Sequence, residues 1–443
     1  MPDRATLPNP AWVALAGFLL VGAACAALAP AMYWALLEAA AVVGAGVLIW
    51  HHLEVASAIW LIVAACTLEM TLYDLVGPAA FATTIAPVKA AGVALAVACV
   101  LRYGPRLDLF NPAWAFAAMF VAGLAHGLHP GLTASDSLRS LVGSVTPYAF
   151  GFSRLSRRWA RAVIGATQIA PLVSVAGGAC LALAGLRALF VDSGGARLEA
   201  LGHPAFLAAV TLAAIYASLV ELYRDGRARD LVLLGVNFVI LVLTGARAPL
   251  LYGTVVVLLT LGFVSAPAMP GRRRALLLLA AGLAALVLAL AAASLSGLRV
   301  FNLLLSDAGD LSGREELWPY FERAAARSPW FGWGVGSGNT VVPQGSDVVL
   351  QMHTWAAHNE WLRIVVEGGQ VGRAALVVLF ALWCWRHTRG LASAERTIMR
   401  LVFLAFACHA FTDNVLISTS ACVLFAFCAA VFARGALEAE GAG

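Results

Sequence analysis

Five ionisable residues at or near the ends of long apolar segments are the best candidates for chemistry: Arg139, Arg247, Arg314, His358 and Asp413. Histidine is the side chain whose ordinary pKa suits proton abstraction near neutral pH, so His358 is a candidate general base. It lies where a long polar stretch re-enters an apolar segment, a position that allows solvent exchange beside a partly dry environment. A structural histidine is the competing interpretation, and His353 is a competing residue.

Two of the arginines stand in positions that are unfavourable unless an anion is nearby. Arg247 is the single charge between two long apolar runs. A charge this close to hydrocarbon is costly and usually has a partner, which favours a function over a snorkelling side chain. Arg314 opens a predicted helix, where its charge opposes the helix dipole unless an anion binds beside it. An exposed surface charge explains Arg314 equally well.

The composition places these residues in a membrane protein. Hydrophobic residues make up 61% of the 443 residues and charged residues only 12%, whereas soluble domains carry about 25% charged residues. Apolar runs such as 275–295 and 415–432 approach the roughly 20 residues that cross a bilayer as a helix. The first run, 11–29, lacks a convincing cleavage region after it and is interpreted as a span rather than a signal peptide. The sequence therefore predicts an all-α polytopic membrane protein.

Arginine clusters between the apolar runs predict which side of the membrane each turn faces. By the positive-inside rule the cytoplasmic clusters are Arg102 with Arg106, Arg154 to Arg161, Arg224 to Arg229, Arg272 to Arg274, and Arg386 to Arg400. The turns between them, at 129–136, 191–204, 245–248, 296–358 and 412–414, then face the opposite side. This alternation predicts an even number of spans, about 12–14, with both termini cytoplasmic. Separate short basic clusters also argue against nucleic-acid binding.

The segment 296–358 is far longer than a turn between spans requires, and loops of that size are usually functional. It divides the chain into N-terminal spans (1–295), a loop (296–358) and C-terminal spans (359–443). Residues 313–328 read as an amphipathic helix, with Leu317, Phe321 and Ala324 on one face. Pro329 is expected to end it.

A glycine-rich run, Gly332 to Gly338, follows this helix. Its glycines permit tight turns and close backbone approach to a ligand, but the run lacks the Lys-Ser/Thr ending of a P-loop. The aromatic residues Trp330, Phe331 and Trp333 fit an interfacial belt slightly better than a sugar-binding surface. All eight cysteines lie in apolar segments without metal-ligand spacing, so neither disulfides nor zinc are expected.

Four motifs together resemble the O-antigen ligase and polymerase family: Thr244-Gly245-Ala246-Arg247, the stretch from Ser312-Gly313-Arg314 to Trp318, the run Gly332 to Gly338, and His358-Asn359-Glu360-Trp361-Leu362 continuing through Gly369 to Gly372. The resemblance covers the C-terminal half well, whereas the N-terminal spans resemble the family only in hydropathy. Gly245 stands where the family often has serine. That difference leaves the expected role of Arg247 intact.

The resemblance implies a GT-C-like helical bundle with a periplasmic site in the bacterial inner membrane. The implied reaction is inverting, metal-independent transfer of an undecaprenyl diphosphate-linked O-antigen onto a lipid A-core oligosaccharide, without a cofactor. In that reaction Arg247 and Arg314 would bind the diphosphate oxygens and His358 would deprotonate the acceptor hydroxyl. Arg139 would have a supporting role at a phosphate, and Asp413 would orient an arginine or the acceptor. A structural ion pair explains these two equally well.

Two other functions remain open at this stage. An O-antigen polymerase would share the donor and the four motifs and differ in its acceptor, a second lipid-linked repeat. The ligase is favoured by analogy, because the long loop lies late in the chain, the histidine stands at its end and no soluble domain is appended. A polyprenol-glycan flippase or other transporter would require ionisable residues near mid-membrane, whereas most of the acids near spans, Glu38, Glu69, Asp74 and Glu221, lie close to predicted span ends.

Overall fold

The computed structural model describes residues 44, 46–292, 294–301, 316–343, 345–352, 354–416 and 419–441. The chain separates into two compact units, residues 1–56 and residues 57–443. The described part of the first unit is a largely helical segment, residues 46–56. The second unit holds the site and nearly all of the described elements.

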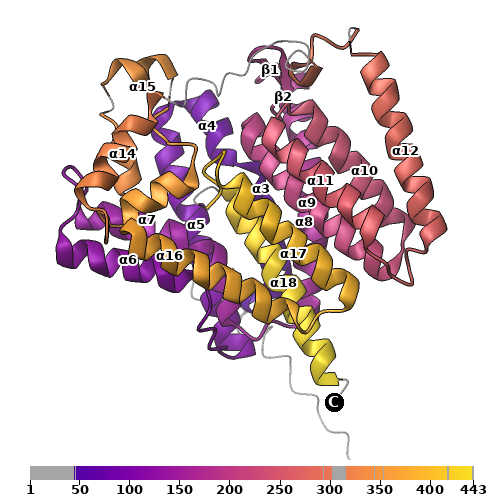
Figure 1. The fold of residues 1–443 in the computed structure, drawn as a ribbon, viewed down its shortest axis with the longest axis horizontal. Helices are drawn as coiled ribbons and strands as arrows, with labels where there is room; N and C mark the ends of the chain where they lie inside the picture. The colour runs from indigo at the N-terminus through magenta and orange to yellow at the C-terminus, as the bar shows by residue number, and fades with distance from the viewer. Residues whose placement is uncertain are drawn as a thin grey trace, which may run out of the picture. The chain divides into compact units, whose positions relative to one another are not determined.

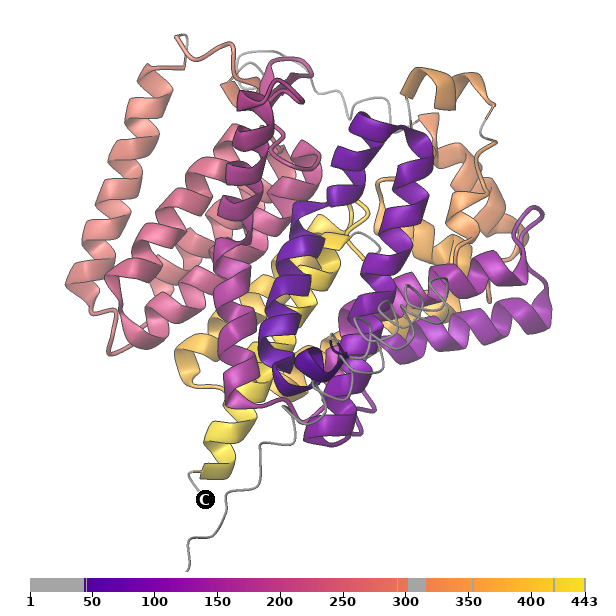
Figure 2. The same ribbon diagram turned by 180° about the vertical axis from the view of Figure 1, so that it is seen from behind.

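The helices and strands follow one another in three groups along the chain (Figure 1; Figure 2 shows the opposite side). The first group is α3 (Leu53–Cys66), α4 (Leu68–Val76), α5 (Pro78–Tyr103), α6 (Ala113–His126), α7 (Ala134–Val145), the 3-10 helix η1 (Thr146–Phe152) and α8 (Arg157–Leu183). The second is β1 (Phe190–Asp192), β2 (Ala196–Leu198), α9 (Pro204–Asp225), α10 (Ala228–Leu243), α11 (Arg247–Phe263) and α12 (Gly271–Leu290). The third is α14 (Trp318–Arg327), η3 (Ser337–Asn339), α15 (Asp347–Met352), α16 (Glu360–Thr388), α17 (Ser393–His409) and α18 (Thr419–Gly441).

The prediction of an all-α polytopic membrane protein is confirmed. Six described helices are long and apolar enough to cross a membrane: Ile85–Tyr103, α8, α9, α12, α16 and α18. A seventh span results if α3 and α4, bent by 50°, count as one. The described residues thus contain six or seven of the expected 12–14 spans, and two further apolar helices, α6 and α11, are shorter than a full span. The first expected span, 11–29, lies outside the described residues.

The spans differ widely in how much of their surface is buried inside the protein. About four fifths of the apolar window of α9 (78%) and of α18 (83%) is buried inside the protein, whereas none of the window of α12 is buried. A helix that is apolar all round and buried belongs to the centre of a bundle. Helix α12 has the same apolar character but contributes no side chain to that core.

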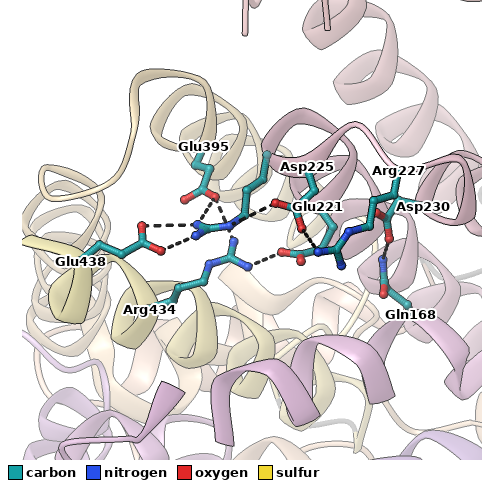
Figure 3. Close-up of polar contacts among 9 residues, drawn as sticks. Gln168, Glu221, Asp225, Arg227, Asp230, Glu395, Arg434 and Glu438 are labelled. Carbon is teal, nitrogen blue, oxygen red and sulfur yellow. Dashed lines mark hydrogen bonds and ion pairs between the residues drawn. The ribbon is translucent and has the colours of Figure 1, made fainter. Parts of the chain in front are cut away.

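A network of ion pairs joins α9, α17 and α18 at one end (Figure 3). Arg434 of α18 contacts Glu221 of α9 and, at 3.0 Å, Glu395 of α17. Arg224 of α9 contacts Glu395 at 3.1 Å and also Glu438 of α18. Arg434 and Glu395 are buried, and a buried charge is tolerated only when it is paired. The network therefore fixes the relative positions of three helices.

The helices of the second unit thus have two distinguishable ends. The arginine end carries Arg224, Glu395 and Arg434. The opposite, histidine end begins at His203, because α9 has 22 residues and spans about 33 Å between His203 and Asp225. The arginine clusters 224–229 and 386–400, predicted to share one side of the membrane, both lie at the arginine end.

Segment 316–358 has its own small core at the start of α16. As predicted, Leu317, Phe321 and Ala324 form the buried face of a helix. The described helix α14 begins at Trp318 and ends at Arg327, just before Pro329, whereas the first expected residues, 313–315, lie outside the described residues. The three side chains pack in one cluster with residues that include Val366 of α16. The loop is therefore docked onto a membrane helix.

Helix α16 is broken at Gly369, and residues 329–334, which include the start of the glycine-rich run, form hydrogen bonds with the backbone groups at the break. Gly369 has φ +60° and ψ −165°, so the normal hydrogen bonds of the next turn are not formed. The freed carbonyl groups of Val366 and Glu367 accept hydrogen bonds from the backbone N–H groups of Trp333 and Gly334, each at 2.9 Å. The freed N–H groups of Gln370 and Val371 donate to the carbonyl groups of Pro329 and Trp330, at 2.8 and 3.1 Å. All four groups at the break are satisfied, as burial in an apolar environment requires.

Glycines make this close approach possible. A Cβ atom on Gly332 would lie 2.5 Å from the backbone of Glu367, and one on Gly369 would overlap the backbone of Trp330. The close backbone approach predicted for this run is made to α16 at Gly332, and to Gly123 of α6 and Ser140 of α7 at Gly334 and Gly336.

Candidate functional site

His358 and Asp413 form a pair at the histidine end. The Nδ1 atom of His358 lies 3.1 Å from Oδ1 of Asp413, and the two side chains are 26% and 32% exposed. The other ring nitrogen, Nε2, lies 3.3 Å from the hydroxyl oxygen of Thr354. This exposure leaves the pair accessible to a substrate.

The pair selects one tautomer of the imidazole. Asp413 Oδ1 also accepts the backbone N–H of Asn414 at 2.8 Å, as expected for an ionised carboxylate. The carboxylate therefore accepts the Nδ1–H of His358, and Nε2 keeps the lone pair. A histidine held in this way by a carboxylate is the arrangement of a general base. The sequence predicted that Asp413 orients an arginine or the acceptor, whereas the structure places its carboxylate against His358.

The backbone around His358 is fixed on both sides. Trp318 of α14 donates its indole N–H to the carbonyl of Ala357 at 3.0 Å. The side chain of Asn359 caps α16 by accepting the N–H of Leu362 at 3.1 Å. His358 itself has φ +47°, a left-handed conformation that is rare outside glycine and occurs at strained functional positions.

Arg247 is the first residue of α11, at the histidine end. Its side chain is exposed and makes no hydrogen bond or ion pair within the described part of the chain. One turn further along α11, the ring of Tyr252 lies 5.5 Å from that of His409 at the end of α17. The backbone carbonyl of His409 in turn accepts the backbone N–H of Asp413 at 3.2 Å. The start of α11 and the His358–Asp413 pair thus flank the same end of α17.

Two further arginines surround the turn before Arg247. Arg197 of β2 donates its Nε–H to the carbonyl of Thr244 at 2.8 Å. Arg299, after α12, donates to the hydroxyl of Ser193 at 2.7 Å and also to the carbonyl of that residue. A Cβ atom on Gly245 would lie 3.1 Å from Arg299 and 3.5 Å from Arg197, and Gly245 has φ +62°. Glycine is therefore needed at this position of the turn.

His203 is a second histidine close to the pair. It precedes α9, and its Nδ1 accepts the N–H of Ala205 at 3.2 Å, so this nitrogen is unprotonated. The pKa of His203 is lowered to about 4, first by desolvation within the surrounding protein and then by the charge of Arg197. The residue is nevertheless partly exposed to solvent. The charges of Asp413 and His358 also act on this ring. His203 is therefore neutral at pH 7 beside the candidate base.

The two remaining predicted arginines add nothing to the geometry of the pair given above. Arg139 is an exposed residue of α7, and the hydrogen bonds of His358 go to Thr354 and Asp413. Arg314 lies outside the described residues. Within the described ranges, no three His, Cys, Asp or Glu side chains come together as ligands for a metal ion.

A second histidine–carboxylate pair lies at the arginine end. His387 Nε2 lies 2.9 Å from Oδ2 of Asp108, which also accepts the indole N–H of Trp383 at 2.8 Å. Arg106, which can only donate, lies 3.2 Å from Nδ1 of His387. Both ring nitrogens have partners, as they do in His358, but the His387 and Asp108 side chains are only 4% and 1% exposed. Burial therefore makes this pair structural, whereas His358 and Asp413 are accessible.

Some polar residues near the site were not foreseen from the sequence. Arg363 is buried between Glu360 and Glu367, with its Nε 2.9 Å from Glu360 and Nη1 2.7 Å from Glu367. The spacing i, i+3 and i+7 in an apolar helix was a readable signal of this triad. Arg197 and Arg299 had no such signal, because only the folded chain brings the α8–α9 connection and the segment after α12 to Gly245.

An apolar cavity of about 410 Å³ lies between α16 and α17. Its lining runs from Glu360 and Ala410, near the histidine end, to Arg400 near the arginine end. Large apolar side chains such as Leu404 line it and are exposed.

The fold and its candidate spans define a polytopic all-α membrane protein whose accessible histidine–carboxylate pair lies at one end of its helices. Residues 231–377 match the sequence model of the O-antigen ligase family, and this match supports assignment of the chain to that family. It covers about a third of the chain, from the start of α10 into α16, and contains Arg247 and His358 but not Asp413, Arg139 or Arg197. The search of curated proteins gave no match.

Proposed function

We propose that the protein transfers an O-antigen glycan from undecaprenyl diphosphate to a hydroxyl of lipid A-core oligosaccharide, with a GT-C-like bundle and the histidine end facing the periplasm of the inner membrane. Both termini would be cytoplasmic. The family match supports O-antigen ligase or polymerase activity in general. The observation that carries the finer proposal is the His358–Asp413 pair, because Asp413 holds Nδ1 of a histidine that is 26% exposed, and Nε2, which lies 3.3 Å from the Thr354 hydroxyl, is the nitrogen that would take the proton.

The proposed reaction is a single displacement. Nε2 of His358 takes the proton of the acceptor hydroxyl while its oxygen attacks the anomeric carbon of the donor sugar. The bond between that carbon and the diphosphate oxygen breaks, the configuration inverts, and undecaprenyl diphosphate leaves with the electron pair. Arg247 and Arg314 stabilise the negative charge on the leaving group, so the step needs no metal ion. Arg139 remains a candidate for a supporting phosphate contact.

The test uses purified protein in detergent with lipid-linked O-antigen, lipid A-core and EDTA, and scores transfer on a gel. Wild type should form lipopolysaccharide, and His358→Ala should lose transfer by a factor of about 10² to 10⁴, the usual contribution of a general base. A matched control is His126→Ala, an exposed histidine of α6 that should transfer normally. Retained transfer in His358→Ala would refute the assignment of the base.

The same assay separates the alternatives. A donor that lengthens only on its own lipid would identify a polymerase. No product of either kind, together with loss of glycan export in cells after substitution of Glu69 and Asp74, would favour a transporter. These two acids contact Thr419 and Arg187, at 3.4 and 2.8 Å.

A further inference from the structure

Positive charge gathers at the arginine end, where α16 and α17 meet. Arg386 and Arg389 lie at the end of α16, and Arg396 and Arg400 lie in the first half of α17. Within the described residues none of these four arginines forms an ion pair, and the neighbouring Glu395 is paired with arginines of α9 and α18. Unbalanced positive charge at a membrane surface attracts the head groups of anionic lipids.

Two of these arginines, Arg389 and Arg400, lie at the arginine end of the α16–α17 cavity. Arg400 lines the cavity, and its Nε–H donates to the hydroxyl of Thr388 at 3.1 Å. The guanidinium carbon of Arg389 lies 4.6 Å from the ring centre of Trp385, which also lines the cavity. Both arginines are exposed. A guanidinium group has five N–H donors, so both side chains keep the paired donors that bind phosphate oxygens.

The cavity itself has the lining and the length that an acyl chain needs. Trp385 and Leu404 line it and are 53% and 62% exposed, so the cavity opens on the outer surface of the bundle. Its lining on α17 runs from Arg400 to Ala410, which is about 15 Å along a helix. One leaflet contributes a similar length to the roughly 30 Å hydrocarbon layer. A phosphorylated head group at Arg400 therefore leaves room for an acyl chain in the cavity.

We propose that the α16–α17 cavity is a binding site for cardiolipin, with one phosphate at Arg389, the other at Arg400, and an acyl chain between the two helices. Basic pockets between membrane helices bind this lipid in other proteins. Two guanidinium groups with available donors at one end of the cavity favour a lipid with two phosphates over a lipid with one. The inference does not depend on glycosyl transfer and goes beyond it, since His358 precedes α16 and Asp413 follows α17. A lipid packed between these helices stabilises the frame that carries both halves of the pair.

The test is native mass spectrometry of the delipidated full-length protein in detergent, titrated with tetraoleoyl cardiolipin or with dioleoyl phosphatidylglycerol. Each arginine–phosphate contact near a membrane surface changes affinity by about fivefold, so wild type should bind cardiolipin about fivefold more tightly than phosphatidylglycerol. Arg389→Gln should weaken cardiolipin binding by about fivefold, and the double variant with Arg400→Gln by about 30-fold.

Two further variants with matched controls test the position of the lipid. Leu404→Trp fills the cavity and should abolish most of the cardiolipin binding, whereas Leu279→Trp on α12, where the leucine is 60% exposed, should bind normally. Arg373 is an exposed arginine that also lines the cavity, but it lies about 22 Å along α16 from Thr388. Arg373→Gln should therefore keep wild-type affinity.

Three outcomes would overturn the proposal. Unchanged affinity in the Arg389→Gln/Arg400→Gln double variant and in Leu404→Trp would show that the lipid binds only to the general membrane surface of the protein. Equal affinity for cardiolipin and phosphatidylglycerol would exclude a site for two phosphates. Loss of binding in Arg373→Gln, with the double variant unaffected, would place the head group at the other end of the cavity. Lipid binding is measured without donor or acceptor, so its failure is distinguishable from failure of the transfer assay.

Discussion

Replacement of Asp413 by asparagine removes the charge that holds His358 while keeping the shape of the side chain. The Nδ1–H of His358 then loses a hydrogen bond to a charged acceptor at 3.1 Å. Such a bond contributes about 1.5–3 kcal/mol, and each 1.4 kcal/mol corresponds to a tenfold change in rate, so kcat should fall about 10- to 100-fold. An asparagine amide that donates instead would stabilise the wrong tautomer and increase the loss.

The assay is initial rate of transfer against donor and acceptor concentration. KM for the donor should stay unchanged in Asp413→Asn, because the carboxylate positions the base rather than the diphosphate. Adding Asp413→Asn to His358→Ala should cause no further loss, since Asp413 acts through His358. Asp347→Asn, in the same loop region, is the control. A kcat within twofold of wild type, or a further loss in the double variant, would refute the reasoning.

Three further predictions concern stability, measured as the thermal midpoint in detergent. Gly369→Ala should lower the free energy of unfolding by at least about 2 kcal/mol, because Gly369 has φ +60° and the new methyl group would overlap the backbone of Trp330. The control Gly390→Ala has open space around the new methyl group and should leave stability nearly unchanged. Arg434→Met should cost about 3 kcal/mol, since Glu221 loses its contact with Arg434 and the buried Glu395 keeps only Arg224; an unchanged midpoint would contradict the network. The pKa of His203 is lowered from 6.5 to about 4, so between these pH values the unfolded chain binds a proton that the folded protein does not, and stability falls as pH is lowered. The full shift corresponds to about 3 kcal/mol, reduced to about 1 kcal/mol by the solvent exposure of the ring. His203→Asn, which keeps the cap, should lose less stability across this range, and an equal loss would exclude His203 as the cause.

Composition and spacing were enough to predict the membrane class, the loop helix and the main candidate residues. The membrane class follows from hydropathy, because long apolar segments are stable in lipid. The loop helix follows from spacing, because Leu317, Phe321 and Ala324 repeat at intervals that put them on one face of a helix. His358 was identified because its type and its place at a segment boundary are both local properties.

The partners of these residues depend on tertiary structure and could not be predicted from the sequence. Asp413 lies 55 residues after His358, and either could have been half of another ion pair. The described residues hold six or seven of the expected 12–14 spans, and apolar helices such as α11, with 17 residues, are shorter than the length that hydropathy suggests for a span. The glycine-rich run indicated a close backbone approach but not its neighbour, because the sequence looks the same whether that neighbour is a substrate or a helix.

The hydrogen-bond exchange between this run and the break in α16 also constrains how the protein folds. Before the run docks, the four backbone groups at Val366, Glu367, Gln370 and Val371 have no partners, and hydrocarbon supplies none. The half of α16 before Gly369 is therefore stable in an apolar environment only when residues 329–334 have folded against it. The frame that orients His358 is complete only after this docking, so the order of the histidine end depends on a contact made outside it.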